Sequence, residues 1–273
     1  MIVGAALCAS PPLLHPALTG RAVVLPELRA AGAEAVARLL RSGAELVVVV
    51  GPAPATGELD PEERFDPAAF APGCAAAAPS SAGALPLGPG LGSMLLDEAG
   101  YGGPRRLLGV SADEPTEGCA AWGADLAAGA ARTALLVMGD GSARRSLKAP
   151  GHLDPRAEPF DAQVERAVRT GRLGGLLELD EALARDLMVT GRPAWQVLAG
   201  AMADEARSAG AGAGGAGAGA AGAGGAGAGG AGADRAGLTG AEADGALVTE
   251  VLYRDDPFGV AYLVACLHPS WRP

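Results

Sequence analysis

The segment Glu45-Leu-Val-Val-Val-Val-Gly51 decides the fold, because a continuous β-branched run that ends in glycine is typical of a strand covered on both faces. Strands of this kind belong to sheets that lie between layers of helices. Apolar runs at 2–8 and 133–138 predict two further buried strands, and 106–111 predicts a fourth. The chain therefore has the strand pattern of an α/β protein.

Segments with helical periodicity separate these runs along the chain. The helices that we expect cover residues 26–41, 93–99, 116–131, 160–170, 180–190 and 195–207. Strands at 247–254 and 260–267 flank the turn Asp255-Asp256-Pro257-Phe258-Gly259 and predict a final antiparallel pair. We therefore expect one α/β domain over residues 1–273, with a central, mostly parallel (mixed) sheet flanked by helices on both faces.

Two segments lack these periodic patterns. Residues 52–90 are rich in Pro, Ala and Gly and predict a long loop. Within that loop, Gly88-Pro-Gly-Leu-Gly92 fails the spacing of a dinucleotide-binding loop, because Ser93 follows it, and we interpret it as a flexible glycine turn before a helix. Residues 209–233 contain only Ala and Gly and predict a disordered insert within the domain.

The amino-acid composition indicates which binding partners and which cellular location to expect for the protein. Acidic residues outnumber basic ones by 31 to 21, so the chain repels phosphate backbones and we expect no nucleic-acid partner. No apolar run reaches the ~18 residues of a membrane helix, and the apolar start at 1–12 predicts a strand rather than a signal peptide, so we expect a cytoplasmic protein that does not bind membranes. Cys8 and Cys266 lie in apolar runs and should be buried. A homo-oligomer is compatible with the sequence.

A turn with polar side chains follows the strand at 133–138. In Gly139-Asp-Gly-Ser-Ala143, Asp140 and Ser142 stand at the carboxyl end of that strand, where open α/β sheets bind ligands. The two residues either face a pocket, or Asp140 only caps backbone amides in the turn. Arg144, Arg145 and Lys148 follow and either hold an anionic ligand or lie in a solvated loop.

Three histidines are the only imidazole groups that a metal site could use: His15, His152 and His268. A non-haem Fe(II) site typically needs two His and one carboxylate on a common face, with open positions for oxygen and substrate. His15 follows the first strand, and His152 lies in a polar loop not far beyond Asp140 in the sequence. Spacing alone does not show that they meet, and surface or supporting histidines are the more usual interpretation.

Seven blocks, taken in order, resemble the actinobacterial class III extradiol ring-cleavage dioxygenase proteins of the subunit-B-like family. The blocks are Pro11-Pro-Leu-Leu14, Glu45 to Gly51, Val137 to Arg145, Pro150 to Ala157, Phe160-Asp161, Trp195 to Gly200 and Tyr253 to Tyr262. They extend over nearly the whole chain, apart from 52–90 and the Ala/Gly insert. The resemblance implies a mixed sheet between helical layers and Fe(II)- and O₂-dependent opening of the ring of a small aromatic molecule, a catechol.

The resemblance also implies site residues. Two His and one Glu would hold the iron, for which His15 and Glu250 are the metal candidates. Asp140, Ser142 and His152 are the catalytic candidates from their positions in the turn and the polar loop, and not from the resemblance.

Arg144 and Arg145 are the candidates for binding the substrate. Two positions depart from the family pattern: Gly51-Pro-Ala-Pro54 contains no histidine where the second ligand would fall, and Ala143 stands where the acid/base histidine would follow Ser142.

Three functions follow from these observations. The first is extradiol ring opening with Fe(II). The second is a catalytically silent relative that binds a small molecule or a protein in the same cleft. The third is an enzyme of other chemistry that uses Asp140, Ser142, the Arg144/Arg145 pair and His152.

Overall fold

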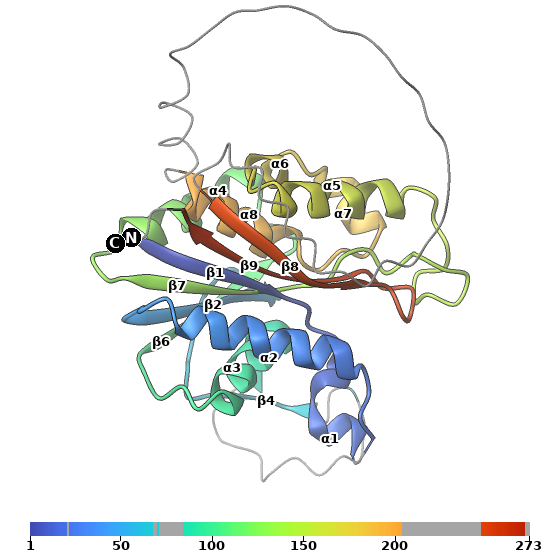
Figure 1. The fold of residues 1–273 in the computed structure, drawn as a ribbon. Helices are drawn as coiled ribbons and strands as arrows, with labels where there is room; N and C mark the ends of the chain where they lie inside the picture. The colour runs from blue at the N-terminus through green and yellow to red at the C-terminus, as the bar shows by residue number, and fades with distance from the viewer. Residues whose placement is uncertain (21, 68–69, 71–83, 204–246, 271–273) are drawn as a thin grey trace, which may run out of the picture.

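A seven-stranded sheet with the strand order β3-β6-β2-β7-β1-β9-β8 forms the centre of the structure, which is a computed structural model (Figure 1). The structure describes residues 1–20, 22–67, 70, 84–203 and 247–270. Four strands are parallel: β1 (Ile2–Cys8), β2 (Leu46–Ala53), β6 (Arg105–Ser111) and β7 (Thr133–Met138). The antiparallel strands are β3 (Gly57–Leu59) at one edge and β9 (Tyr262–Pro269), which joins β1 to the edge strand β8 (Leu247–Asp255).

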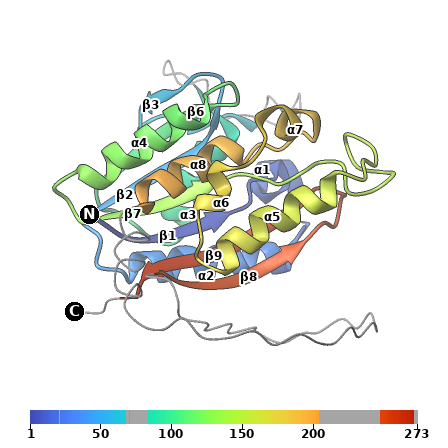
Figure 2. The ribbon, with the colours of Figure 1, turned by 90° about the horizontal axis from the view of Figure 1, so that it is seen from above.

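Helices cover both faces of this sheet. On one face lie α2 (Pro26–Leu40) and α3 (Leu87–Glu98). On the other face α4 (Thr116–Ala128) and α8 (Arg192–Ala201) lie side by side, and α5 (Ala157–Arg169) lies over the β8–β9 hairpin (Figure 2). Shorter helical segments complete the layers: Pro12–Leu14, α1 (Pro16–Thr19), α6 (Gly174–Leu177) and α7 (Glu181–Asp186). The expected α/β class is confirmed.

Each face of the sheet carries its own apolar core, because successive side chains of a strand point to opposite faces. In β1, Ile2, Ala5 and Leu7 pack under α5 and α8, whereas Ala6 and Cys8 pack against the α2–α3 layer. Both faces of the central strands are therefore buried, which is why their sequences are continuous apolar runs. The expected burial of Cys8 and Cys266 is confirmed.

The region 52–90 differs from the expected long loop. It contains β3, a small parallel pair made of β4 (Arg64–Phe65) and β5 (Ala84–Leu85), and the start of α3. The prediction of a flexible glycine turn was wrong, because Gly88, Gly90 and Gly92 are helical and buried in α3. A Cβ atom on Gly92 would lie 2.5 Å from Cγ1 of Val49, so glycine is needed there for close packing of the helix on the sheet.

Some expectations concern residues outside the described ranges. The Ala/Gly insert at 209–233 is one of them, and so are residues 68–69 and 71–83 of the expected loop. Within the ranges that the structure does describe, no helix is long and apolar enough to cross a membrane.

The loops after β1 and β7 lead to opposite faces of the sheet. After β1 the chain enters α2 on one face of the sheet, and after the neighbouring β7 it continues to α5 on the other face. The two loops therefore diverge at the carboxyl ends of β1 and β7, which is the topological switch point where open α/β sheets bind ligands.

Candidate functional site

Asp140 lies at this switch point and is hydrogen-bonded by both diverging loops. The Gly139 amide donates a hydrogen bond to the Cys8 carbonyl at 3.0 Å and joins the ends of β7 and β1. The Ser10 amide donates to Oδ1 of Asp140 at 2.6 Å. The Asp140 amide in turn donates to Oγ1 of Thr190 at 3.0 Å. The Asp140 carboxylate therefore accepts a hydrogen bond from a backbone amide, as one of the two interpretations of the turn predicted. The amide, however, belongs to Ser10 in the loop after β1 and not to the turn itself.

Burial raises the pKa of Asp140 to about 7, although the hydrogen bonds from Ser10 act in the opposite direction. A carboxyl group with such a pKa changes between its protonated and ionised forms near neutral pH. Groups of this kind at the switch point of a sheet are suited to donate or accept a proton from a ligand. Asp140 therefore remains the candidate for acid–base chemistry at this switch point.

The raised pKa of Asp140 predicts a pH-dependent stability. Between the ordinary value of 3.8 and about 7, the folded state keeps a proton that the unfolded state releases. This group therefore favours folding at low pH, and the contribution is lost as the pH rises through 7. From about pH 5 to about pH 8 we expect the wild type to lose about 2 kcal/mol more unfolding free energy than Asp140→Asn.

Urea unfolding of both proteins at the two pH values measures this difference. Asp113→Asn is the control, because the Asp113 side chain is 83% exposed and should leave the pH dependence of the wild type unchanged. An Asp140→Asn variant with the same pH dependence as the wild type would mean that Asp140 is already ionised at pH 5.

Ser142, the second polar residue of the turn, is completely buried. Its Oγ donates a hydrogen bond to Oδ2 of Asp161 at 2.5 Å, and its amide donates to Oδ1 of Asp161 at 2.9 Å. The Ala261 amide donates to the Ser142 carbonyl at 2.9 Å. Ser142 therefore ties the turn to α5 and to the β8–β9 hairpin, and this position suits a positioning residue better than a nucleophile.

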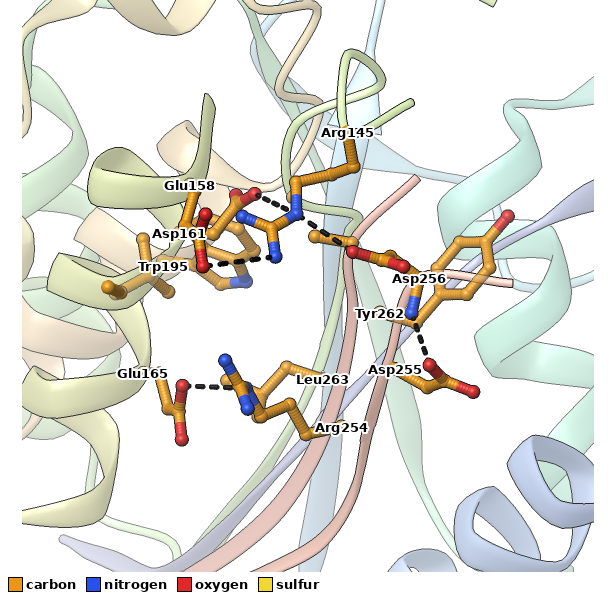
Figure 3. Close-up of a pocket in the computed structure, with 14 residues that line it drawn as sticks. Arg145, Glu158, Asp161, Glu165, Trp195, Arg254, Asp255, Asp256, Tyr262 and Leu263 are labelled. Atoms are coloured by element: carbon orange, nitrogen blue, oxygen red, sulfur yellow. Dashed lines mark hydrogen bonds and ion pairs between the residues drawn. The ribbon is translucent and has the colours of Figure 1, made fainter. Parts of the chain in front are cut away.

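A pocket of about 150 Å³ lies beside this turn, between α5 and the β8–β9 hairpin (Figure 3). Its lining includes five carboxylic acids and two arginines, and we call it the acidic pocket. The acids are Glu158, Asp161 and Glu165 of α5 with Asp255 and Asp256 of the hairpin, and the arginines are Arg145 and Arg254. The three acids of α5 are spaced by three and four residues, so they share one face of the helix. Trp195, Val164 and Leu263 supply apolar lining.

Two arginines connect the walls of the acidic pocket through ion pairs. Nε of Arg145 lies 2.9 Å from Oδ2 of Asp256 and 3.8 Å from Oδ2 of Asp161. Nη2 of Arg145 also lies 4.0 Å from Oε1 of Glu158. Near the opposite end, Nε of Arg254 lies 2.7 Å from Oε2 of Glu165 (Figure 3). Both guanidinium groups are therefore already paired with carboxylates.

Asp161 is the most enclosed of these acids. Burial raises its pKa, whereas the hydrogen bonds from Ser142 and the charge of Arg145 act against that rise. The sequence did not mark Asp161 as a site residue, although Phe160-Asp161 was one of the blocks that resemble the dioxygenase-like proteins.

The other candidate residues lie outside the acidic pocket. Arg144 does not line it, and Nε of Arg144 is buried without a hydrogen-bond partner among the described residues. His152 is exposed, and its Nδ1 lies 2.9 Å from the Leu147 carbonyl oxygen. Of the two arginines predicted to bind a substrate, only Arg145 reaches the pocket.

The two metal candidates have different surroundings. Nδ1 of His15 accepts a hydrogen bond from the Ala17 amide at 3.3 Å, and the His15 ring packs 5.2 Å from the Phe65 ring. Glu250, in β8, pairs with Nη1 of Arg38 at 2.6 Å. Among the described residues, no group of three or more His, Cys, Asp and Glu is arranged to hold a metal ion. These residues do not fit the iron that the resemblance implies.

Comparisons with known proteins identify neither a family nor a function for the chain. No family model matches the chain, and no curated protein matches it. Among solved structures it is similar to the crystal structure of an uncharacterized protein from Escherichia coli K12, with 14% identity and a TM-score of 0.47. The alignment covers 97% of this chain and 99% of that chain.

Proposed function

We propose that the chain is a relative of the class III extradiol dioxygenase subunit-B-like proteins that binds a small aromatic diol in the acidic pocket without opening its ring. The observation that carries this proposal is the pocket itself. Its volume is about 150 Å³. An apolar cavity of ~150 Å³ engineered into another protein binds benzene, so one aromatic ring matches the available space.

The lining of the acidic pocket suits a hydroxylated ring. Trp195 and Leu263 offer apolar surface for the ring, and aromatic pairs add to the gain from burial. Phenolic hydroxyls donate hydrogen bonds, and the carboxylates of Asp161 and Asp256 accept them. Small-molecule sites commonly combine an apolar wall with a few polar groups that fix the orientation of the ligand.

The residues at the family's catalytic positions favour binding over ring opening. His15 contacts Ala17 and Phe65, whereas Glu250 pairs with Arg38. Ala143 has no group that transfers a proton where the resemblance implies a histidine. The acidic pocket and the formal net charge of −10 also favour a small molecule over a nucleic acid.

Anaerobic thermal unfolding with catechol tests this proposal. We expect catechol to raise the melting temperature of the wild type, because a ligand that binds only the folded state stabilises it. Ala162→Leu should abolish the rise, since Ala162 lines the pocket and a larger side chain would fill it. Ala124→Leu is the matched control, because Ala124 is an exposed residue of α4 and the catechol effect should persist.

Two results would overturn the proposal. Equal stabilisation of Ala162→Leu and the wild type would place the ligand elsewhere. Oxygen consumption with catechol after Fe(II) is added would instead support the ring-opening activity that the resemblance implies.

A further inference from the structure

The ion pairs of the acidic pocket determine which ligand charge it can accept. Arg145 faces carboxylates from both walls, and its side chain is only 15% exposed. An anionic ligand would therefore have to compete with Asp256 and Asp161 for this guanidinium. A cationic ligand meets the opposite situation, because the carboxylic acids that line the pocket outnumber the arginines by five to two.

Glu165 is the carboxylate best placed to receive a cation from a ligand. Its side chain is 18% exposed and forms part of the α5 wall, whereas that of its partner Arg254 is 58% exposed. Nη1 of Arg169 also lies 4.0 Å from Oε1 of Glu165, and the Arg169 side chain is 54% exposed. Both arginines can therefore move their guanidinium groups into solvent at little cost, since exposed ion pairs contribute little to stability. Glu165 has less freedom to move, because its side chain is mostly enclosed by its neighbours in the wall of the pocket.

We propose that the acidic pocket selects a ring that carries a protonated amine or guanidinium group, with the cation bound by Glu165 in place of the Arg254 guanidinium. This proposal rests on the proposed function, from which it takes the location of the ligand in the acidic pocket. It adds the charge that the ligand carries. The distance along α5 fits this arrangement. Glu158 and Glu165 are seven residues apart, which corresponds to about 10 Å along a helix axis, so a ring and a short cationic arm fit along the row of acids.

Three small probes of similar shape test the charge preference: benzylamine, benzyl alcohol and benzoate. We expect benzylamine to bind about tenfold more tightly than benzyl alcohol, as one charge-assisted hydrogen bond would provide. Benzoate should bind more weakly than either. The tenfold ratio should shrink as salt is added, because part of the interaction lies near solvent. Calorimetry or the fluorescence of Trp195 can follow the binding.

Glu165→Gln tests the role of the carboxylate. The variant keeps the shape of the side chain and loses its charge, so the ratio of benzylamine to benzyl alcohol affinity should fall close to one. Glu117→Gln makes the same change at an exposed position of α4 and should keep the ratio of the wild type. A ratio that survives in Glu165→Gln, or benzoate that binds as tightly as benzylamine, would overturn the inference.

The inference and the proposed function can fail separately. If catechol binds but benzylamine shows no advantage over benzyl alcohol, the charge preference is wrong and the diol site remains. If benzylamine binds through Glu165 but catechol does not bind, the diol is wrong and the charge preference remains.

Discussion

Arg192→Met is expected to lower the free energy of unfolding by about 3–5 kcal/mol, which is the usual loss when one partner of a buried charged network is removed. The Arg192 side chain is only 3% exposed. Its Nη2 donates hydrogen bonds to the carbonyl oxygens of Ala112 at 2.6 Å and Glu114 at 3.0 Å, and its Nη1 donates to Oε1 of Gln196 at 2.8 Å. Methionine fills much of the same volume but removes the guanidinium donor from all three acceptors.

Urea unfolding of Arg192→Met and the wild type measures the loss. Arg185→Met is the matched control, because Arg185 contacts the same loop through Asp113 at 3.1 Å but its side chain is 58% exposed. An exposed pair of this kind contributes about 1 kcal/mol or less. Equal losses in the two variants would show that the network around Arg192 does not hold the loop after β6.

Gly123→Ala should lower the free energy of unfolding by about 3 kcal/mol, at the upper end of the usual cost of overpacking. A Cβ atom at this position would lie 2.1 Å from the Val197 carbonyl oxygen and 2.5 Å from the Ala201 amide nitrogen. Both atoms belong to the α8 backbone, so no side chain can rotate away and the helices α4 and α8 must separate. This cost exceeds the roughly 1 kcal/mol by which alanine favours a helix over glycine.

Thermal unfolding gives a direct comparison with Gly32→Ala in α2. A Cβ atom on Gly32 would have no heavy atom within 4 Å, so that variant should gain up to about 1 kcal/mol from helix propensity. The two substitutions are chemically identical and should shift the melting temperature in opposite directions. A neutral Gly123→Ala variant would mean that α4 and α8 can move apart without losing their packing.

The sequence was most informative about the central strands. β1 and β7 were predicted with the observed bounds, because buried strands of a parallel sheet have continuous apolar sequences. α3 was predicted to begin at Ser93, whereas it begins at Leu87. The glycines at the start of α3 have a low helix propensity, which argues against a helix there. They also allow α3 to approach β2 closely, and this packing outweighs the low propensity.

The candidate site was predicted less completely than the fold. Asp140 could be placed at the carboxyl end of β7 because the end of a buried strand is a recognisable position. The acidic pocket combines a turn, a helix and a hairpin that lie far apart in the sequence, and a row of acids on a helix is ordinarily a solvated surface. The number of residues between His15 and Glu250 also gives no distance between them in space. In the structure His15 contacts the Ala17 amide, whereas Glu250 pairs with Arg38.

The position of β9 has a consequence for synthesis of the chain. β9 lies between β1 and β8, although it follows all the other described strands in the sequence. Until residues 262–269 are made, β1 has an unpaired edge, and all seven of its residues are buried in the finished sheet. An open apolar strand edge pairs readily with other chains. Ribosomes that stall before this hairpin should therefore release aggregating fragments rather than a smaller folded protein.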